Sequence, residues 1–424
     1  MTDTHTHSRF LYPILAVFLT TAGFITLKTG RDALYFQEDA LSQLPWAYIW
    51  IAMASMPTAM LHLKVMSLWG PRRTRTGTFL VSAVILFALV PSLNPQNRLA
   101  VVTLFVVAPS MFAALFAGAW LLAGDLLEGA TREELVWSYS RIGGASMLGG
   151  ILGGLQAKML VGAVSPAGLV AIGAAYLVLV AGVIAAAHRR YPRTDGDRVI
   201  SSVGLFTMII ESRLVRHPYL QTLAGIAVLN ALATLFIDFQ FYGSAIKAGS
   251  NNAEFFANFY IVLNTAAFGL QLFVAPRIQS RLGVAGTLLI LPVSLLGLSG
   301  AFGFAGSFLG RSAVKIAEGG LKSAIHRSAW EQAFLPIETD CRGFGKIVVE
   351  GLSARLAEGL GAIILLVWMT FTAFDAADPD LTWITIGSIF FLLGWVILTR
   401  SMSRLDLECD SSDPSSPVIS LPDT

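Results

Sequence analysis

The stretch VVTLFVVAPSMFAALFAGAWLL, residues 101–122, decides the fold of this chain because its 22 consecutive residues carry no charge. An α-helix needs about 20 mainly apolar residues to cross a hydrocarbon core about 30 Å thick. The rest of the chain agrees, since 55% of the 424 residues are hydrophobic and only 13% are charged, against about 25% charged in soluble domains. This composition excludes a soluble globular protein and predicts an integral membrane protein.

Apolar runs of similar length recur from one end of the chain to the other and predict an all-α, polytopic membrane protein with about twelve transmembrane helices. Helices are favoured over strands because a barrel would show short alternating segments. The first run ends in Lys28, Arg31 and Asp32, where a signal peptide would have a small-residue cleavage site. The expected helices lie near residues 10–33, 46–63, 76–93, 99–124, 141–163, 166–187, 219–242, 254–275, 284–304, 307–334, 344–373 and 381–399.

The distribution of basic residues predicts the topology. Placing the N-terminus in the cytoplasm puts eighteen lysines and arginines in inner loops and tails, and only Arg98 and Lys247 in outer loops. Because short basic loops resist export, we expect a multi-pass protein of the bacterial inner membrane with both termini cytoplasmic. Cys341 and Cys409 then face the reducing side, so no disulfide is expected.

A basic segment in the middle of the chain predicts four regions. The N-terminal six-helix bundle covers residues 1–187, a cytoplasmic basic linker covers 188–218, and the C-terminal six-helix bundle covers 219–404. Residues 405–424 lack apolar periodicity and are expected to form a disordered tail. The linker joins two repeats in this interpretation, although a solvated loop that merely fixes the topology would look the same.

The two predicted halves share sequence features. Arg31 and Tyr35 keep the same four-residue spacing as Asp238 and Tyr242, at an offset of 207 residues. In both halves a tryptophan at a helix end leads into an acidic loop, a basic residue and a Gly-rich helix. Transporters built from internal repeats place their substrate site at the repeat interface near the membrane midplane, so we expect the same here.

Basic residues inside the predicted spans are the candidates for function, because each costs at least a few kcal/mol at the bilayer centre unless it faces a cavity or a partner. These residues number nine: Lys28, Arg31, Arg141, Lys158, Arg311, Lys315, Lys322, Arg327 and Arg355. They predict a strongly basic interior.

The predicted tenth helix, 307–334, carries a polar face. Arg311, Lys315, Glu318, Lys322 and His326 follow one another at helical spacing, which confines them to an arc of about 80° on a regular α-helix. This pattern favours an electropositive wall of a water-filled pathway for an anionic solute. The alternative is an amphipathic helix that lies on the cytoplasmic leaflet and binds anionic lipid.

Charges on the predicted first and seventh helices suggest internal pairing. Lys28 and Asp32 are four residues apart, so an ion pair between them would leave Arg31 as the uncompensated cation. Snorkelling of these side chains to the outer interface is the alternative. Asp238 ends a polar ridge that begins at Asn230 and is either a counter-ion or a proton site. We expect Arg31 and Asp238 to be coupled across the two halves.

The remaining motifs argue against catalysis. The Gly-rich segment 141–154 predicts a surface for close helix packing, and no strand or Gly-Lys-Ser/Thr accompanies its glycines as a phosphate loop would require. The sequence shows no metal-ligand spacing, nucleophile elbow or close His/Asp/Ser set. We therefore expect no enzyme activity, no cofactor, no metal and no nucleic-acid partner.

Three segments resemble the nucleotide transporters, the ATP/ADP translocases of plastids and intracellular bacteria and their bacterial relatives. Residues 27–34, LKTGRDAL, resemble the first-helix motif of this family; residues 120–154 resemble its stretch from an aromatic-Trp helix end to a small-residue helix. Residues 331–338, EQAFLPIE, are similar to its Lys-Glu-Met-Ala-Tyr-Ile-Pro-Leu-Asp/Glu motif. The resemblance implies a major-facilitator-like fold of two six-helix bundles and nucleotide transport, with ATP/ADP antiport as the family's activity.

The resemblance also assigns positions. The family's basic residue before the first-helix aspartate falls on Arg31, and its seventh-helix acid falls on Asp238. Two family lysines are replaced by Tyr242 and Trp330. These differences favour an anion carrier with a shifted substrate.

The leading hypothesis is a secondary transporter of a small anionic, nucleotide-like solute that works by alternating access, with exchange or proton coupling. Membrane lipid is the only other expected partner. The alternative is a non-transporting membrane scaffold or lipid-handling protein whose basic face binds headgroups. The predicted solute-binding residues are Lys28, Arg31, Asp238, Arg311, Lys315 and Lys322.

Overall fold

A computed structural model of the chain describes residues 3–36, 40–127, 132–192, 218–250, 252–304, 307–334, 347–372, 374–375 and 380–411. Across these ranges the structure is helical and contains no β-strand. The predicted all-α class is confirmed. Cys341, most of the predicted linker and the last thirteen residues of the predicted tail lie outside the described ranges.

Ten helices in the described ranges are long and apolar enough to cross a membrane. Two of the twelve predicted spans do not meet that standard, although both are helical. One is α5 (Arg132–Leu160), and the other is the run of α11 (Phe308–Leu321), the π-helical turn η6 (Lys322–His326) and α12 (Arg327–Gln332). Polar residues in both runs lower their mean hydropathy, so composition alone does not mark them as spans.

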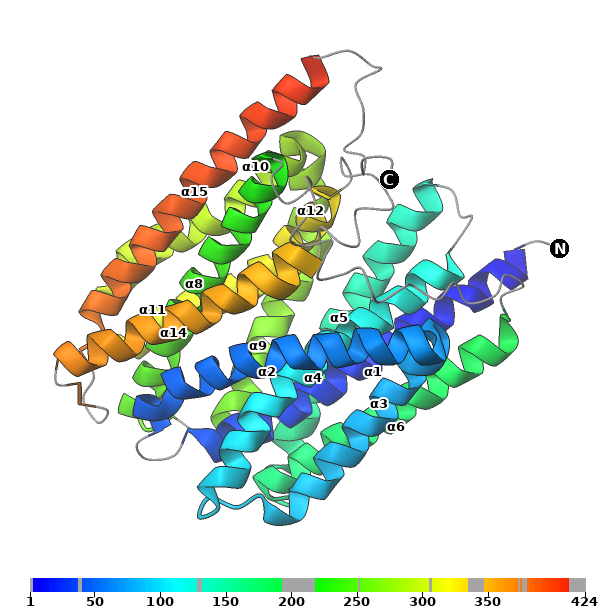
Figure 1. Ribbon diagram of the computed structural model, residues 1–424, viewed down its shortest axis with the longest axis horizontal. Helices are drawn as coiled ribbons and strands as arrows, with labels where there is room; N and C mark the ends of the chain where they lie inside the picture. The colour runs from blue at the N-terminus through cyan, green and yellow to red at the C-terminus, as the bar shows by residue number, and fades with distance from the viewer. Residues whose placement is uncertain are drawn as a thin grey trace. The chain divides into compact units, whose positions relative to one another are not determined.

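The chain divides into two compact units (Figure 1), each of which combines segments from both predicted halves. Unit 1 comprises residues 1–38, 57–202 and 250–268. Its helices are α1 (Asp3–Tyr35), the part of α2 (Ala40–Trp69) from Pro57 onward, α3 (Pro71–Leu89), α4 (Arg98–Leu126), α5, α6 (Pro166–Arg190) and most of α9 (Ala253–Gly269).

Unit 2 comprises residues 39–56, 203–249 and 269–424. It contains the first part of α2, the run from α11 to α12, and the following further elements: α8 (Pro218–Lys247), η4 (Leu270–Val274), α10 (Ala275–Leu298), η5 (Ser299–Gly303), η7 (Ile347–Ser353), α14 (Ala354–Phe371) and α15 (Thr382–Ser411). The predicted tail therefore begins as a continuation of α15, whose helix extends to Ser411.

Side-chain caps define where several helices begin. The Asn97 side chain accepts a hydrogen bond from the backbone N–H of Ala100 at the start of α4. Ser165 caps α6 in the same way, with Pro166 in the first helical position. Such caps satisfy backbone donors that have no partner inside the helix, so polar residues fix the ends of otherwise apolar segments.

Close helix packing holds α1 at the centre of unit 1. A Cβ atom on Gly149 of α5 would lie 2.3 Å from the carbonyl oxygen of Phe18, and one on Gly153 would lie 2.4 Å from that of Ala22. Only glycine allows two backbones to approach this closely. The predicted packing role of the Gly-rich helix is thereby confirmed.

The core of unit 2 forms where α8, α10 and α15 meet. Its buried side chains include Leu223, Leu291 and the fully buried Trp395. Large apolar side chains elsewhere point outward, among them Met159 and Phe371, which are 82% and 85% exposed. Outward apolar side chains suit a protein whose surroundings are lipid.

Candidate functional site

The main charged cluster of unit 2 lies on α8, on α11 and on Lys322, the first residue of η6. The Nζ atom of Lys315 is 2.5 Å from Asp238 Oδ1 and 2.7 Å from Glu318 Oε2. The Nζ atom of Lys322 lies 3.1 Å from the other carboxylate oxygen of Glu318. Two cations and two anions thus form one chain of ion pairs, called here the α8–α11 ion network.

The predicted polar ridge on α8 joins this network through a hydroxyl group. The Thr234 hydroxyl lies 3.3 Å from Asn230 Oδ1 and 3.2 Å from Glu318 Oε1, and it accepts a hydrogen bond of 3.2 Å from Lys322 Nζ. Asp238 lies one turn further along. The sequence spacing therefore located the face of α8 that meets α11.

Burial differs across the network. The side chain of Glu318 is 4% exposed and that of Lys315 is 11% exposed, whereas that of Lys322 is 41% exposed. The Tyr48 hydroxyl of α2 donates a long hydrogen bond of 3.3 Å to Asp238 Oδ2. An unpaired charge is expensive in a low-dielectric interior, so Lys315 and Glu318 depend on each other, and Lys322 is the accessible charge.

Arg311 and His326, the two ends of the predicted stripe, are buried. Within the described ranges, Arg311 Nε and His326 Nδ1 have no hydrogen-bond partner. The His326 ring packs edge-on against Trp330 with ring centroids 5.6 Å apart.

Arg311 also acts on the carboxyl group of Asp380. Hydrogen bonds from Thr382 are the main cause that lowers the pKa of Asp380, and the charge of Arg311 lowers it further by a weaker attraction.

The helix that carries the stripe is not the regular α-helix predicted for residues 307–334. It passes into the π-helical turn η6 after Leu321. A π-helical turn closes hydrogen bonds between residues five apart, so the 100° spacing does not hold from Lys322 onward. The predicted 80° arc is wrong for this reason. Lys315 and Lys322 are also paired with Asp238 and Glu318 rather than left as bare cations; their role in solute binding stays a prediction.

A second charged cluster lies in unit 1. Arg31 is bound to Asp32 by two contacts, at 2.8 Å from Nε and 2.5 Å from Nη2, and both side chains are buried. The Tyr260 hydroxyl of α9 donates a hydrogen bond of 2.5 Å to the other oxygen of Asp32. The guanidinium group also lies 4.5 Å from the ring centroid of Phe105.

The expectation that Arg31 would be an uncompensated cation is wrong, because Arg31 is paired with Asp32. Its long side chain turns back to its neighbour Asp32, and the Phe105 ring stabilises it there by a cation–π contact. The Lys28 ammonium group lies 4.7 Å above the Tyr260 ring. Arg31 lies in unit 1 and Asp238 in unit 2, so their coupling stays a prediction.

Each unit also contains a hydrogen-bonded pair of uncharged polar side chains. In unit 1 the Tyr176 hydroxyl donates to Gln156 Oε1 at 3.0 Å. In unit 2 the Thr385 hydroxyl donates to Gln240 Oε1 at 2.7 Å. Sequence reasoning missed these residues and Tyr260, because a single hydroxyl or amide in an apolar run gives no charge signal.

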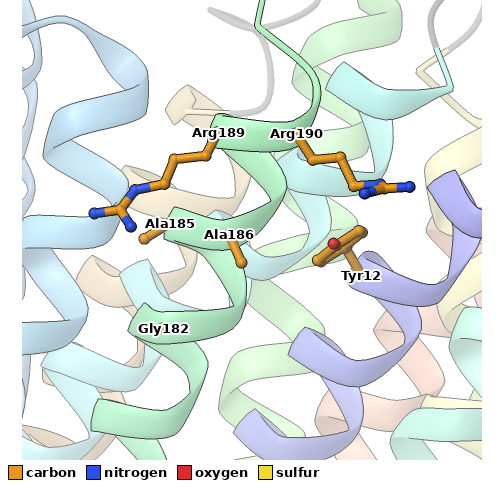
Figure 2. Close-up of a pocket in the computed structure, with 6 residues that line it drawn as sticks. All are labelled: Tyr12, Gly182, Ala185, Ala186, Arg189 and Arg190. Atoms are coloured by element: carbon orange, nitrogen blue, oxygen red, sulfur yellow. The ribbon is translucent and has the colours of Figure 1, made fainter.

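A separate open pocket of about 570 Å³ lies at the end of α6 in unit 1. Figure 2 shows Arg189 and Arg190 diverging from the last turn of α6, with Tyr12 of α1 below Arg190. The remaining lining residues are Gly182, Ala185 and Ala186.

The described residues offer no cluster of three or more His, Cys, Asp or Glu side chains that could hold a metal ion. The arrangement they do show can exchange partners. Two aspartates, the buried Asp32 and the partly buried Asp238, each contact both a cation and a tyrosine hydroxyl. Such clusters can take up an ionic or hydrogen-bonding solute by replacing one internal partner.

Comparison with known proteins identifies the fold. No protein-family profile and no curated protein sequence matches the chain. A solved structure of a single-site mutant of the nucleoside transporter NupG is similar, with a TM-score of 0.63 and 14% identity over 94% of this chain and 99% of that one. A second structure of NupG has a TM-score of 0.61 and 13% identity over the same shares of both chains. At this level of identity the similarity shows the fold alone: the chain has the major-facilitator-like fold of that transporter.

Proposed function

We propose that the chain is a secondary transporter that moves a small nucleoside-like solute, anionic and most like a nucleotide, by alternating access. The observation that carries this proposal is the buried α8–α11 ion network, in which Lys315 and Glu318 are held inside an apolar bundle. Charged groups buried in membrane proteins are costly and mark solute and ion pathways. The fold shared with a nucleoside transporter supports the same assignment.

The network suggests how a solute would bind. An empty site must neutralise its own charges before it can reorient, and here Asp238 and Glu318 do so for the two lysines. An anionic group of the solute would contact Lys322, the accessible cation, and draw it from Glu318. Arg311, buried one turn before Lys315, is the further cation in reach of the same face.

Solute binding that separates Lys322 from Glu318 would couple transport of the solute to a second ion. Once Lys322 pairs with the solute, Glu318 has lost one of its two lysines. The site regains neutrality when a proton binds to the carboxylate. Alternatively, a second anion carried on the return step cancels the net charge moved across the membrane over the full cycle. Proton coupling and exchange are therefore the two forms of coupling consistent with this charge arrangement.

Flux into proteoliposomes tests the proposal. Purified protein should take up a radiolabelled nucleotide faster than protein-free vesicles, and an internal nucleotide or an inward proton gradient should accelerate uptake. The matched neutral nucleoside should be a weaker substrate. Absence of uptake for all nucleosides and nucleotides under both conditions would refute the proposed transport function. Faster uptake of the neutral nucleoside would refute the proposal that the solute is anionic.

A further inference from the structure

We propose that Tyr48 and Tyr260 are a matched pair of positioning residues that hold one conformation of the transport cycle. Each tyrosine comes from the second helix of one predicted half and binds the first-helix aspartate of the other half. Tyr260 of α9 donates to Asp32 of α1, and Tyr48 of α2 donates to Asp238 of α8. This inference rests on the proposed transport function, since it assigns the residues that must separate during reorientation.

The register of the four residues supports a repeat relation. The two tyrosines are 212 residues apart and the two aspartates 206 residues apart, close to the repeat offset found in the sequence. Both tyrosines lie early in their helices, in the third turn of α2 or α9. The two hydrogen bonds are therefore counterparts, related by exchange of the two halves.

Each hydrogen bond acts on an ion pair. Asp32 binds Arg31 with one carboxylate oxygen and Tyr260 with the other. Asp238 divides its oxygens in the same way between Lys315 and Tyr48. Departure of a tyrosine therefore removes one hydrogen bond from a paired carboxylate, so each ion pair responds to the distance between the halves.

The packing beside the tyrosines also joins the predicted halves. In unit 1, Ala257 of α9 belongs to a buried cluster with Ala157 of α5 and Leu169 of α6. In unit 2, a Cβ on Gly359 of α14 would lie 3.1 Å from the Ala52 side chain of α2. Movement of one half against the other would open these apolar contacts together with the tyrosine hydrogen bonds.

The test uses Tyr260→Phe, Tyr48→Phe and the double variant, which remove only the hydroxyl groups. Tyr176→Phe is the matched control, because its hydroxyl bonds to Gln156 inside the first half. The reporter is Ala257→Cys in a background with both native cysteines replaced by Ser, labelled with a membrane-impermeant maleimide. A net hydrogen bond shifts a two-state equilibrium roughly fivefold, so labelling should rise about that much per tyrosine and further in the double variant.

Labelling no faster than in the Tyr176→Phe control would overturn the proposal. If the reporter cysteine disturbs folding, deuterium uptake by α9 peptides of the unlabelled variants provides the same comparison, with faster exchange expected only in the Tyr48 and Tyr260 variants. Neither measurement needs a solute. If the protein transports no nucleotide but shows the expected labelling, the proposed function is refuted, whereas the proposed role of Tyr48 and Tyr260 is supported.

The pocket at the end of α6 carries a second, independent inference: we infer that it binds the headgroup of an anionic phospholipid. Arg189 and Arg190 form the last turn of a helix long enough to span the membrane, so their guanidinium groups lie at the level of the lipid headgroups. Both side chains are exposed. In the described part of the chain, neither has a carboxylate within salt-bridge distance.

The shape of the pocket agrees with a lipid. Gly182 and Ala186 leave the α6 surface below the arginines open, which gives an acyl chain a shallow apolar path. Tyr12 closes the opposite side, beside Arg190 (Figure 2). Basic pockets between transmembrane helices are known to bind anionic headgroups. The cations and the apolar floor together distinguish a phospholipid from free phosphate.

Native mass spectrometry of the protein in nanodiscs tests this inference. With phosphatidylglycerol present, the protein should keep a bound lipid, and the Arg189→Gln/Arg190→Gln variant should lose it roughly tenfold more readily. Arg277→Gln/Arg281→Gln, which removes two arginines of unit 2, is the control. Equal retention in both variants, equal retention of phosphatidylcholine, or displacement by millimolar inorganic phosphate alone would each overturn the inference.

Discussion

Replacing Glu318 by Gln tests the α8–α11 ion network most directly. The native network holds two lysines against two carboxylates, and the variant keeps the side-chain shape but leaves one positive charge in excess. Removing one partner of a buried ion pair costs about 3–5 kcal/mol. Lys315 would keep Asp238 and Lys322 is 41% exposed, so we expect the lower end of that range, about 3 kcal/mol.

The assay compares the unfolding of detergent-purified variants. Lys322→Gln alone should cost less than about 1 kcal/mol because its charge is accessible. Glu318→Gln/Lys322→Gln restores neutrality and keeps the pair of Lys315 with Asp238, so it should be more stable than Glu318→Gln alone. A stabilising second substitution is the signature of coupled charges.

A matched substitution separates this effect from a general cost of losing a carboxylate. Glu331 pairs with Arg327 at 2.8 Å, but the two side chains are 38% and 56% exposed. Glu331→Gln should therefore cost less than about 1 kcal/mol. Equal losses for Glu318→Gln and Glu331→Gln, or strictly additive losses in the double variant at Glu318 and Lys322, would refute the network as a stabilising unit.

Two further predictions concern topology and the solute. Reporters fused at Thr424 and inserted near Asn251 should be active on opposite sides of the membrane, as measured by side-specific enzyme assays, because the basic loops place both termini in the cytoplasm; activity on the same side would contradict this. Lys322→Gln should raise the apparent substrate constant several-fold in uptake assays, from a contact worth about 1 kcal/mol, and added salt should shrink the difference. A cysteine at Lys322 should be protected from impermeant thiol reagents by the solute, whereas a cysteine at the outward-facing Leu309 should not.

Features set by composition and helical spacing could be predicted from the sequence. Apolar run length was sufficient for the all-α membrane class, and the Gly-rich surface of α5 follows from small residues at close spacing. The ridge from Asn230 to Asp238 was also located, since residues four apart share a helix face. These features depend only on local geometry, which is set by residues close together in the sequence.

Features set by competition between neighbours could not be predicted. Lys28 lies one turn before Asp32, and Arg31 lies beside it. The long guanidinium side chain of Arg31 can turn back to Asp32, and the Phe105 ring stabilises it in that position. The π-helical turn at Lys322 changes the register of the stripe, although nothing in its residue types marks it. Tyr260 stands in an apolar run, where it looks like a core aromatic residue.

Charge balance links these observations to the choice of coupling. In each unit an aspartate is paired with a cation: the buried Asp32 with Arg31, and the partly buried Asp238 with Lys315. An anionic solute that enters such a site adds a charge that the internal pairs had already balanced, and the low-dielectric surroundings make a net charge costly to move across the membrane. Under the proposed function, a carrier with this interior would therefore move a proton with its anion or return with another anion, rather than move the anion alone.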